Sequence, residues 1–392
     1  MKRKTKKWVM ATAGLVISAL ALVFFLYRLG GHWRDVLAAF REARYRYLIP
    51  SIALLSILYA LRIARWKLFL APIKRVGWFS TTSATLIGFT ANNVLPARLG
   101  ELIRPYLLHR REKVGFGHAL ATVGLARVFD LIGLALLLLL TWVILAIGTP
   151  FSARANSVEA LGPGIHQTGT TQSSTESPGT PTGARADLVH KVWKGGLVVA
   201  GMAAAGTCVL LGLALFPAPF LKVGEFCTRI LPEAWRAPLI GLMQSVAEAM
   251  GFLKNWRGVA MAVVLSLGVW LAQGLSTWAL SRGLGLEIGA AGAFLTVIAI
   301  SAAVAVPQGP GFLGTFHLAA ALVAEGFQTP TGQAGAFAML LWLVNIVPVT
   351  LLGFAFLAYE GINLKRLSKE SREMEEREEE DVEQTIENTM NA

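Results

Sequence analysis

Apolar segments of about twenty residues dominate this 392-residue chain and restrict its fold more than any other feature. A helix needs about 20 residues to cross the ~30 Å hydrocarbon core of a bilayer. The segments that reach or approach this length are Trp8–Tyr27, Tyr47–Arg65, Val128–Gly148, Trp193–Phe216, Val259–Leu280 and Ala336–Tyr359. The sequence therefore predicts an all-α fold, a polytopic bundle of membrane-spanning helices.

The composition agrees with a membrane protein. Charged residues make up 15% of the chain, against ~25% in soluble domains. The net charge of +12 comes mainly from bases at helix ends and in short loops, where they fix topology and meet anionic lipid headgroups. We therefore expect no nucleic-acid partner. The two cysteines lack metal-ligand spacing, so we expect no metal, no cofactor and no structural disulfide.

The basic start Lys2–Lys7 precedes the apolar segment Trp8–Tyr27. Signal peptides have a similar start, but their apolar stretch is usually about 7–15 residues and ends at a small-residue cleavage site. This stretch is longer, so we expect a retained first span. Basic segments stay on the cytoplasmic side, which places both termini in the cytoplasm and the polar segment Thr149–Val192 outside. These features predict a multi-pass protein of a bacterial or archaeal cytoplasmic (inner) membrane.

The segment Thr81–Pro96 is apolar but short, and it carries Thr, Asn and Pro. The strongly basic segment Arg98–Lys113 follows it, and such segments favour the cytoplasm. Both placements agree if Thr81–Pro96 enters the membrane and returns on the same side as a re-entrant helix. The loop Arg28–Arg46 is also basic although this topology places it outside, so the orientation rests on the other loops.

Some segments mix apolar residues with charges, which predicts amphipathic helices at the membrane surface. These are Arg34–Arg46, Leu99–Lys113 and Phe220–Leu253. After Lys365 the chain becomes acidic. We divide it into a transmembrane domain, residues 1–364 with the external loop 149–192, and an acidic cytoplasmic tail, residues 365–392. A solvated helix or a disordered segment is the expected state of the tail.

Two clusters of helix breakers and charges interrupt the apolar sequence. Such groups are costly at membrane depth unless they line a polar cavity or face protein. The first cluster runs from Asn92 to Arg104. Pro96 removes a backbone donor and disfavours helix at Leu95. This suits a helix end beside a cavity, where Asn93 can bond freed backbone groups.

The charges of this first cluster form a regular series. Arg98, Glu101 and Arg104 recur every three residues and would share one face of a helix. We expect Glu101 to stay ionised between the two guanidiniums and to hold them in place. An arginine guanidinium can donate two parallel hydrogen bonds to a pair of phosphate oxygens. This series is therefore a candidate binding site for a lipid phosphate. The structural alternative is a cytoplasmic ion-pair network that packs a surface helix.

A charge pair follows in the next apolar segment. Arg127 and Asp130 lie three residues apart and can pair on a helix. Inserting each charge into a membrane span costs ~2.5–3.5 kcal/mol on insertion scales. A pair at this position therefore has a structural or functional role. A contact with substrate and an internal neutralisation that joins two helices fit the sequence equally well.

The second cluster, Pro307–Gly314, contains prolines and glycines that cannot sustain a regular helix. We expect a helix to restart near Phe312. Its N-terminal amides would face the break, as in the anion sites of transporters. The candidate substrate contacts here are Gly309, Gly311, Gly314 and His317. A tight turn between two spans is the structural alternative.

Taken in chain order, these motifs resemble the transmembrane region of lysylphosphatidylglycerol synthetases, which also occurs alone in flippase-like membrane proteins. The resemblance covers roughly Trp8 to Tyr359. The residues that carry it are Asn93, Pro96, Arg98, Gly100, Glu101 and Arg104, then Ala126 to Asp130, then Pro307, Gly309, Pro310 and Gly311, and finally Leu313 to Phe316.

Two departures from the family pattern matter. Many relatives carry a Glu after the Pro-Gly motif, where this chain has His317. The aminoacyl-transferase domain of the synthetases is not found in this sequence, so we expect no synthesis of lysyl-lipid. The segment Thr149–Val192 also looks like an insertion.

The resemblance implies movement of lipids or lipid-linked head groups between leaflets. The expected function is translocation of an anionic lipid or lipid-linked glycan, with membrane lipids as partners. The alternative is a non-catalytic membrane partner of an envelope glycosyltransferase or lipid-modifying enzyme. No nucleophile triad, P-loop or HExxH motif is present, so we expect the protein not to be an enzyme. The sequence leaves the lipid, the coupling ion and the oligomeric state open.

Overall fold

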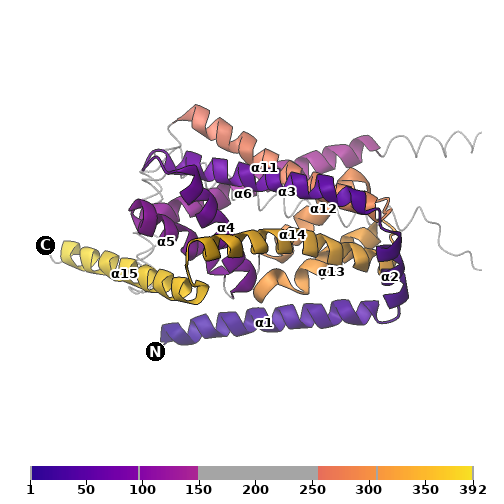
Figure 1. Cartoon of the computed structure of the whole chain (residues 1–392), viewed down its shortest axis with the longest axis horizontal. Helices are drawn as coiled ribbons and strands as arrows, with labels where there is room; N and C mark the ends of the chain where they lie inside the picture. Colours follow the sequence, from indigo (N-terminus) through magenta and orange to yellow (C-terminus); the bar gives the residue numbers. More distant parts are fainter. Residues whose placement is uncertain (1, 96–97, 149–254, 306–307, 391–392) are drawn as a thin grey trace, which may run out of the picture.

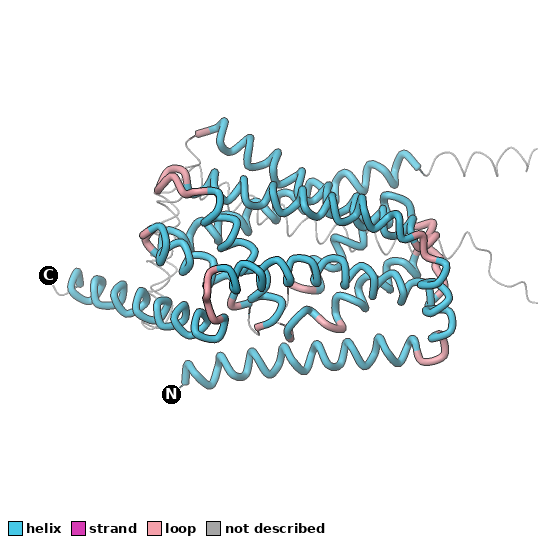
Figure 2. The backbone as a smooth tube through the Cα atoms, in the orientation of Figure 1, coloured by secondary structure: helices cyan, strands magenta, loops and turns pink. Residues whose placement is uncertain are grey.

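The computed structural model describes residues 2–95, 98–148, 255–305 and 308–390. These residues form helices joined by short loops, with no strand among them (Figure 2). The expected all-α fold is therefore confirmed for the described part of the chain. The expectations for Thr149–Val192, Trp193–Phe216 and Phe220–Leu253 lie outside the described residues.

Long apolar helices account for four of the expected spans, Tyr47–Arg65, Val128–Gly148, Val259–Leu280 and Ala336–Tyr359. The described residues contain four helices long and apolar enough to cross a membrane. They are α3 (Leu48–Leu70) with the turn before it, α6 (Phe116–Gly148), α11 (Trp256–Gly283) and α14 (Thr331–Tyr359). The first helix, α1 (Lys2–Leu29), and α2 (Trp33–Glu42) are bent by 85° at their break and would make a fifth span as a pair.

The spans pack as one bundle (Figure 1). Helices α3 and α11 lie along each other, and the hydroxyls of Ser51 and Ser276 are 2.7 Å apart in their buried interface. Small polar residues let membrane helices approach closely and bond across the contact. Both termini lie at the same end of the bundle, whereas α2 lies at the opposite end (Figure 1). This arrangement agrees with termini on one side of the membrane; which side it is stays a prediction.

Helices α4 (Trp78–Val94) and α5 (Gly100–Glu112) form a hairpin whose two ends lie together. The Ser80 hydroxyl at the start of α4 donates to the Glu112 carboxylate at the end of α5, at 2.6 Å. The chain thus enters and returns at one end of the bundle, as a re-entrant segment does. Helix α4 ends at Val94, and Leu95 is extended, with φ −96° and ψ 147°. That conformation is the one that the following proline favours.

The expectation that Leu99–Lys113 is a surface helix is wrong. Helix α5 packs against α4, α6 and α15, and it buries Ile103, Arg104, Tyr106 and Leu107. Gly88 and Gly100 explain the close packing, because a Cβ on either would overlap atoms of the other helix. Arg104, which the sequence places on a solvated face, is therefore inside the protein.

The second cluster forms an irregular break. Helix α12 (Gly289–Ala303) precedes it, the short turn η4 (Pro310–Phe312) lies within it, and α13 (Thr315–Gly326) follows. Gly311 and Gly314 have φ of +68° and +88°, which glycine adopts without the steric cost of a Cβ. The helix restarts three residues later than expected near Phe312, because Gly314 has a non-helical backbone.

The acidic tail begins as a helix, α15 (Leu364–Met390), that packs onto α5. The Tyr106 hydroxyl donates to the Glu370 carboxylate at 2.9 Å, and Leu367 is buried. Hydrogen bonds from Arg366 and Tyr106 hold the pKa of Glu370 below its usual value. The first turns of the tail are thus attached to the bundle.

Candidate functional site

Four arginines from three helices surround one narrow cavity. Arg62 and Arg65 come from α3, Arg104 from α5 and Arg127 from α6. We call these residues, with Asp130 and Glu101, the arginine cluster. The cavity among them measures about 10 Å³, which is room for about one water molecule. Its lining residues are Arg62, Arg65, Trp66, Phe89, Arg104, Val123, Ala126, Arg127 and Asp130.

Two of these arginines have carboxylate partners. Arg65 donates to Asp130 at 2.6 Å and to the Ser266 hydroxyl at 2.7 Å. Arg127 pairs with Asp130 at 3.5 Å and with Glu101 at 2.5 Å. The expected pairing of Arg127 with Asp130 is therefore present, although the shorter bond of Asp130 goes to α3.

The other two arginines, Arg62 and Arg104, contact aromatic rings instead. The Arg104 guanidinium lies 4.3 Å from the ring centre of Trp66 and 5.5 Å from that of Phe89. The Arg62 guanidinium lies 5.3 Å from the same Phe89 ring. Stacking on a ring attracts a cation but does not neutralise it. The Nε atoms of both side chains are buried without a hydrogen-bond partner.

The cluster consequently holds more positive than negative charge. Four guanidiniums face two carboxylates, which leaves a formal charge of +2. Arg65 and Arg104 are 3% and 7% exposed. An uncompensated charge is costly in a buried place. A phosphate group has the opposite charge and acceptor oxygens that match guanidinium forks.

Local sequence places these side chains. Gly88 of α4 leaves the space that the Arg104 side chain occupies, because a Cβ there would overlap it. Arg127 and Asp130 are three residues apart on α6, so both side chains lie on one face of this helix. Arg98 lies before α5 begins, with φ +53°, so it does not continue the helical series with Glu101 and Arg104.

The two sequence clusters meet where α4 ends. The Asn93 amide donates to the Thr350 hydroxyl of α14 at 2.9 Å. A Cβ on Gly311 would lie 3.7 Å from the Asn93 carbonyl oxygen. The Arg98 guanidinium lies 5.9 Å from the Phe312 ring centre. Asn93 and Arg98 therefore border the second cluster rather than the narrow cavity.

The Pro-Gly break is packed by its neighbours. The Gly309 amide donates to the Ser18 hydroxyl of α1 at 2.8 Å, and the Trp342 indole donates to the Gly311 carbonyl at 2.7 Å. A Cβ on Gly314 would overlap the α1 backbone. His317 lies 5.3 Å from the Phe25 ring and 5.5 Å from the Trp342 ring, between centres. It lines neither of the two cavities described here.

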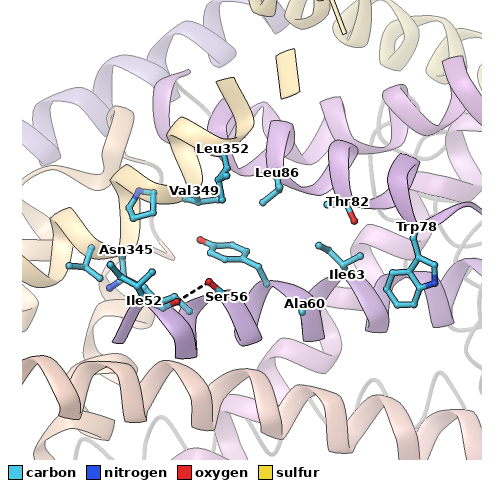
Figure 3. Close-up of a pocket in the computed structure, with 14 residues that line it drawn as sticks. Ile52, Ser56, Ala60, Ile63, Trp78, Thr82, Leu86, Asn345, Val349 and Leu352 are labelled. Carbon is cyan, nitrogen blue, oxygen red and sulfur yellow. Dashed lines mark hydrogen bonds between the residues drawn. The ribbon is translucent and has the colours of Figure 1, made fainter. Parts of the chain in front are cut away.

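An apolar groove lies between α3, α4 and α14 (Figure 3). Its volume is about 350 Å³, within the range typical of ligand pockets. The Tyr59 ring in its wall meets Phe89 edge-on, with ring centres 5.4 Å apart. Because Phe89 also lines the narrow cavity, this ring pair lies between the groove and the arginine cluster. The side chains labelled in Figure 3 are Ile52, Ser56, Ala60, Ile63, Trp78, Thr82, Leu86, Asn345, Val349 and Leu352.

Sequence reasoning missed Arg62 and Arg65. Both lie inside a segment interpreted as an ordinary span, three residues apart. Charged residues within a span are a signal for function, and their shared helix face would have linked them. The pairing of Arg65 with Asp130 across the bundle could not be found from the sequence. Among the described residues, no group of three side chains could hold a metal ion.

A family model described as the lysylphosphatidylglycerol synthase TM region matches residues 11–162 and 183–353. The chain belongs to this family of multi-pass membrane proteins. It is also 23% identical over 316 residues to the glycosyltransferase AglD of Haloferax volcanii, a match that covers 78% of this chain and 47% of the relative. The chain therefore spans about half the length of that curated relative. No solved structure matches.

Proposed function

We propose that this family member binds the phosphate of an anionic lipid or lipid-linked glycan in the arginine cluster and moves that lipid between leaflets. The observation that carries the proposal is the formal charge of +2 in a partly buried cluster, in which Arg65 and Arg104 are buried. The apolar groove beside it supports the same ligand, because a lipid joins an anionic group to a hydrocarbon chain.

The described conformation is closed to such a ligand. The cavity has room for about one water molecule, so a phosphate needs an opening of the α4–α5 hairpin. The Glu101–Arg127 pair joins that hairpin to α6, and its side chains are 30% and 40% exposed. We propose that the phosphate enters here and replaces the Glu101 carboxylate on Arg127. Movement would be downhill or coupled to ions.

Reconstitution in liposomes tests the proposal. Purified protein is inserted into vesicles with fluorescent anionic and zwitterionic lipids, and leaflet exchange is followed per folded molecule. We expect exchange that depends on the headgroup and falls in Arg104→Lys, because an ammonium cannot replace a guanidinium fork. The matched control is Arg28→Lys, which alters an ion pair with Glu325 outside the cluster. Equal exchange by both variants would remove the arginine cluster from the site.

A second candidate function is that of a membrane partner of a glycosyltransferase. The match to the glycosyltransferase AglD favours it, because that relative is about twice the length of the matched region. Absence of exchange for every anionic lipid, together with co-purification of a glycosyltransferase from the native membrane, would favour this candidate. Exchange by the purified protein alone would favour transport.

A further inference from the structure

We infer that the ligand of the arginine cluster carries two negative charges on its phosphate portion. The chemical class is a lipid that ends in a phosphomonoester or contains a diphosphate, rather than a lipid with a single phosphodiester. This inference rests on the proposed function, because it describes the ligand of the same site. It narrows the ligand from any anionic lipid to a dianionic one.

Two guanidiniums of the cluster lack a carboxylate partner. Arg65 and Arg127 are held by Asp130 and Glu101, whereas Arg62 and Arg104 contact only rings among the partners described above. The ligand that neutralises the cluster therefore has two negative charges. A phosphomonoester carries about −1.5 to −2 at pH 7. A phosphodiester carries one charge and would leave a buried guanidinium uncompensated.

The number of donors gives a second argument. Each guanidinium has five N–H donors in a fixed fork. Arg62 and Arg104 flank the Phe89 ring at 5.3 and 5.5 Å, so both belong to one site. A terminal phosphate has three acceptor oxygens for such donors, whereas a diester has only two that are not esterified.

The apolar groove gives a third argument. Tyr59 lies in its wall and contacts Phe89, so hydrocarbon in the groove would end beside the arginines. The occupant to which we commit is the hydrocarbon chain of the same lipid. The Tyr59–Phe89 ring pair lies between the groove and the charged site, so the two are neighbours. Free inorganic phosphate would leave the groove empty.

The test compares two probes with one chain length, dodecyl phosphate and dodecyl methyl phosphate. Binding to the purified full-length protein is measured in a non-ionic detergent at pH 7.5 and pH 5.5. We expect the monoester to bind about tenfold more tightly at pH 7.5, because its second negative charge compensates a guanidinium that the diester leaves without one; tenfold corresponds to about 1.4 kcal/mol. At pH 5.5, about a quarter of the monoester is still dianionic because its second pKa is about 6, so that preference should fall to about threefold.

The protein contributes little to this pH dependence. Among the described residues, no histidine lines the cavity, and the acidic groups that face it are Asp130 and Glu101. The diester is the internal control, because its charge does not change between the two pH values. A third probe, dodecyl methyl diphosphate, keeps two charges at pH 5.5 and separates a diphosphate ligand from a monoester.

Variants test where the preference arises. Arg62→Met and Arg104→Met each reduce the cluster charge to +1, so the ratio of the two affinities should approach one. Arg28→Met, outside the cluster, should leave the ratio unchanged. Equal binding of monoester and diester to the unaltered protein would overturn this inference while the phosphate site stands. Binding of no probe would overturn the site, and with it the proposed function.

Discussion

The arginine cluster and the Pro-Gly break look alike in the sequence, because each puts costly groups into an apolar chain. In the structure they differ. At the break, the Gly309 amide and the Gly311 carbonyl have partners on α1 and α14. In the cluster, Arg62 and Arg104 contact rings and leave charge without a carboxylate.

This difference separates a structural need from a functional one. These two backbone groups of the break need no ligand inside a membrane, because they are already paired, although the His317 Nδ1 after the break is buried without a hydrogen-bond partner. A cluster with excess positive charge destabilises the folded protein. Such a cost is expected where the charges bind a ligand. We therefore propose the cluster as the ligand site and a packing role for the break.

Asp130→Asn should have the largest effect. It removes the carboxylate that Arg65 and Arg127 share, and breaking a buried pair costs about 3–5 kcal/mol. Thermal unfolding in detergent measures the loss. The control is Asp35→Asn, whose side chain is 61% exposed and whose effect should be small. Similar melting temperatures for both variants would show that the cluster does not depend on Asp130.

Gly314→Ala should be the next largest. The residue has φ +88° and its Cβ would overlap the α1 backbone, so strain and overpacking together should cost about 3 kcal/mol. Gly285→Ala is a matched control, because Gly285 has φ +72° with open space around its Cβ. It should cost about 1 kcal/mol. Equal losses would mean that contact with α1 does not stabilise the break.

Arg104→Met should separate function from stability. It removes a buried charge that lacks a carboxylate partner, so the melting temperature should stay the same or rise. Binding of dodecyl phosphate should fall about tenfold. A large loss of stability with unchanged affinity for dodecyl phosphate would show that Arg104 has a structural role. The arginine cluster and the Pro-Gly break would then not differ in function.

Ser18→Ala should have the smallest effect. It removes the acceptor of the Gly309 amide, and one hydrogen bond contributes about 1 kcal/mol. Lipid exchange per folded molecule should not change, because the break is assigned to packing. Loss of lipid exchange in a stable Ser18→Ala protein would show that the Pro-Gly break takes part in the binding site.

Much of the fold could be predicted from the sequence. The lengths of apolar segments identify α3, α6, α11 and α14, because each must span the same hydrocarbon thickness. Pro96 predicts the end of α4 through local sterics. The burial of α5 could not be predicted, because its charges indicate a surface helix until their neighbours are known.

The sequence by itself determined that the protein is a helical membrane bundle and where its helices break, because segment length and backbone sterics act within one stretch of chain. Tertiary structure alone decided which charges lack partners. Arg65 and Asp130 are 65 positions apart, and Glu101 and Arg127 are 26 apart. Whether a guanidinium meets a carboxylate or a ring depends on how α3, α5 and α6 pack, and that packing set the excess charge from which the function is proposed.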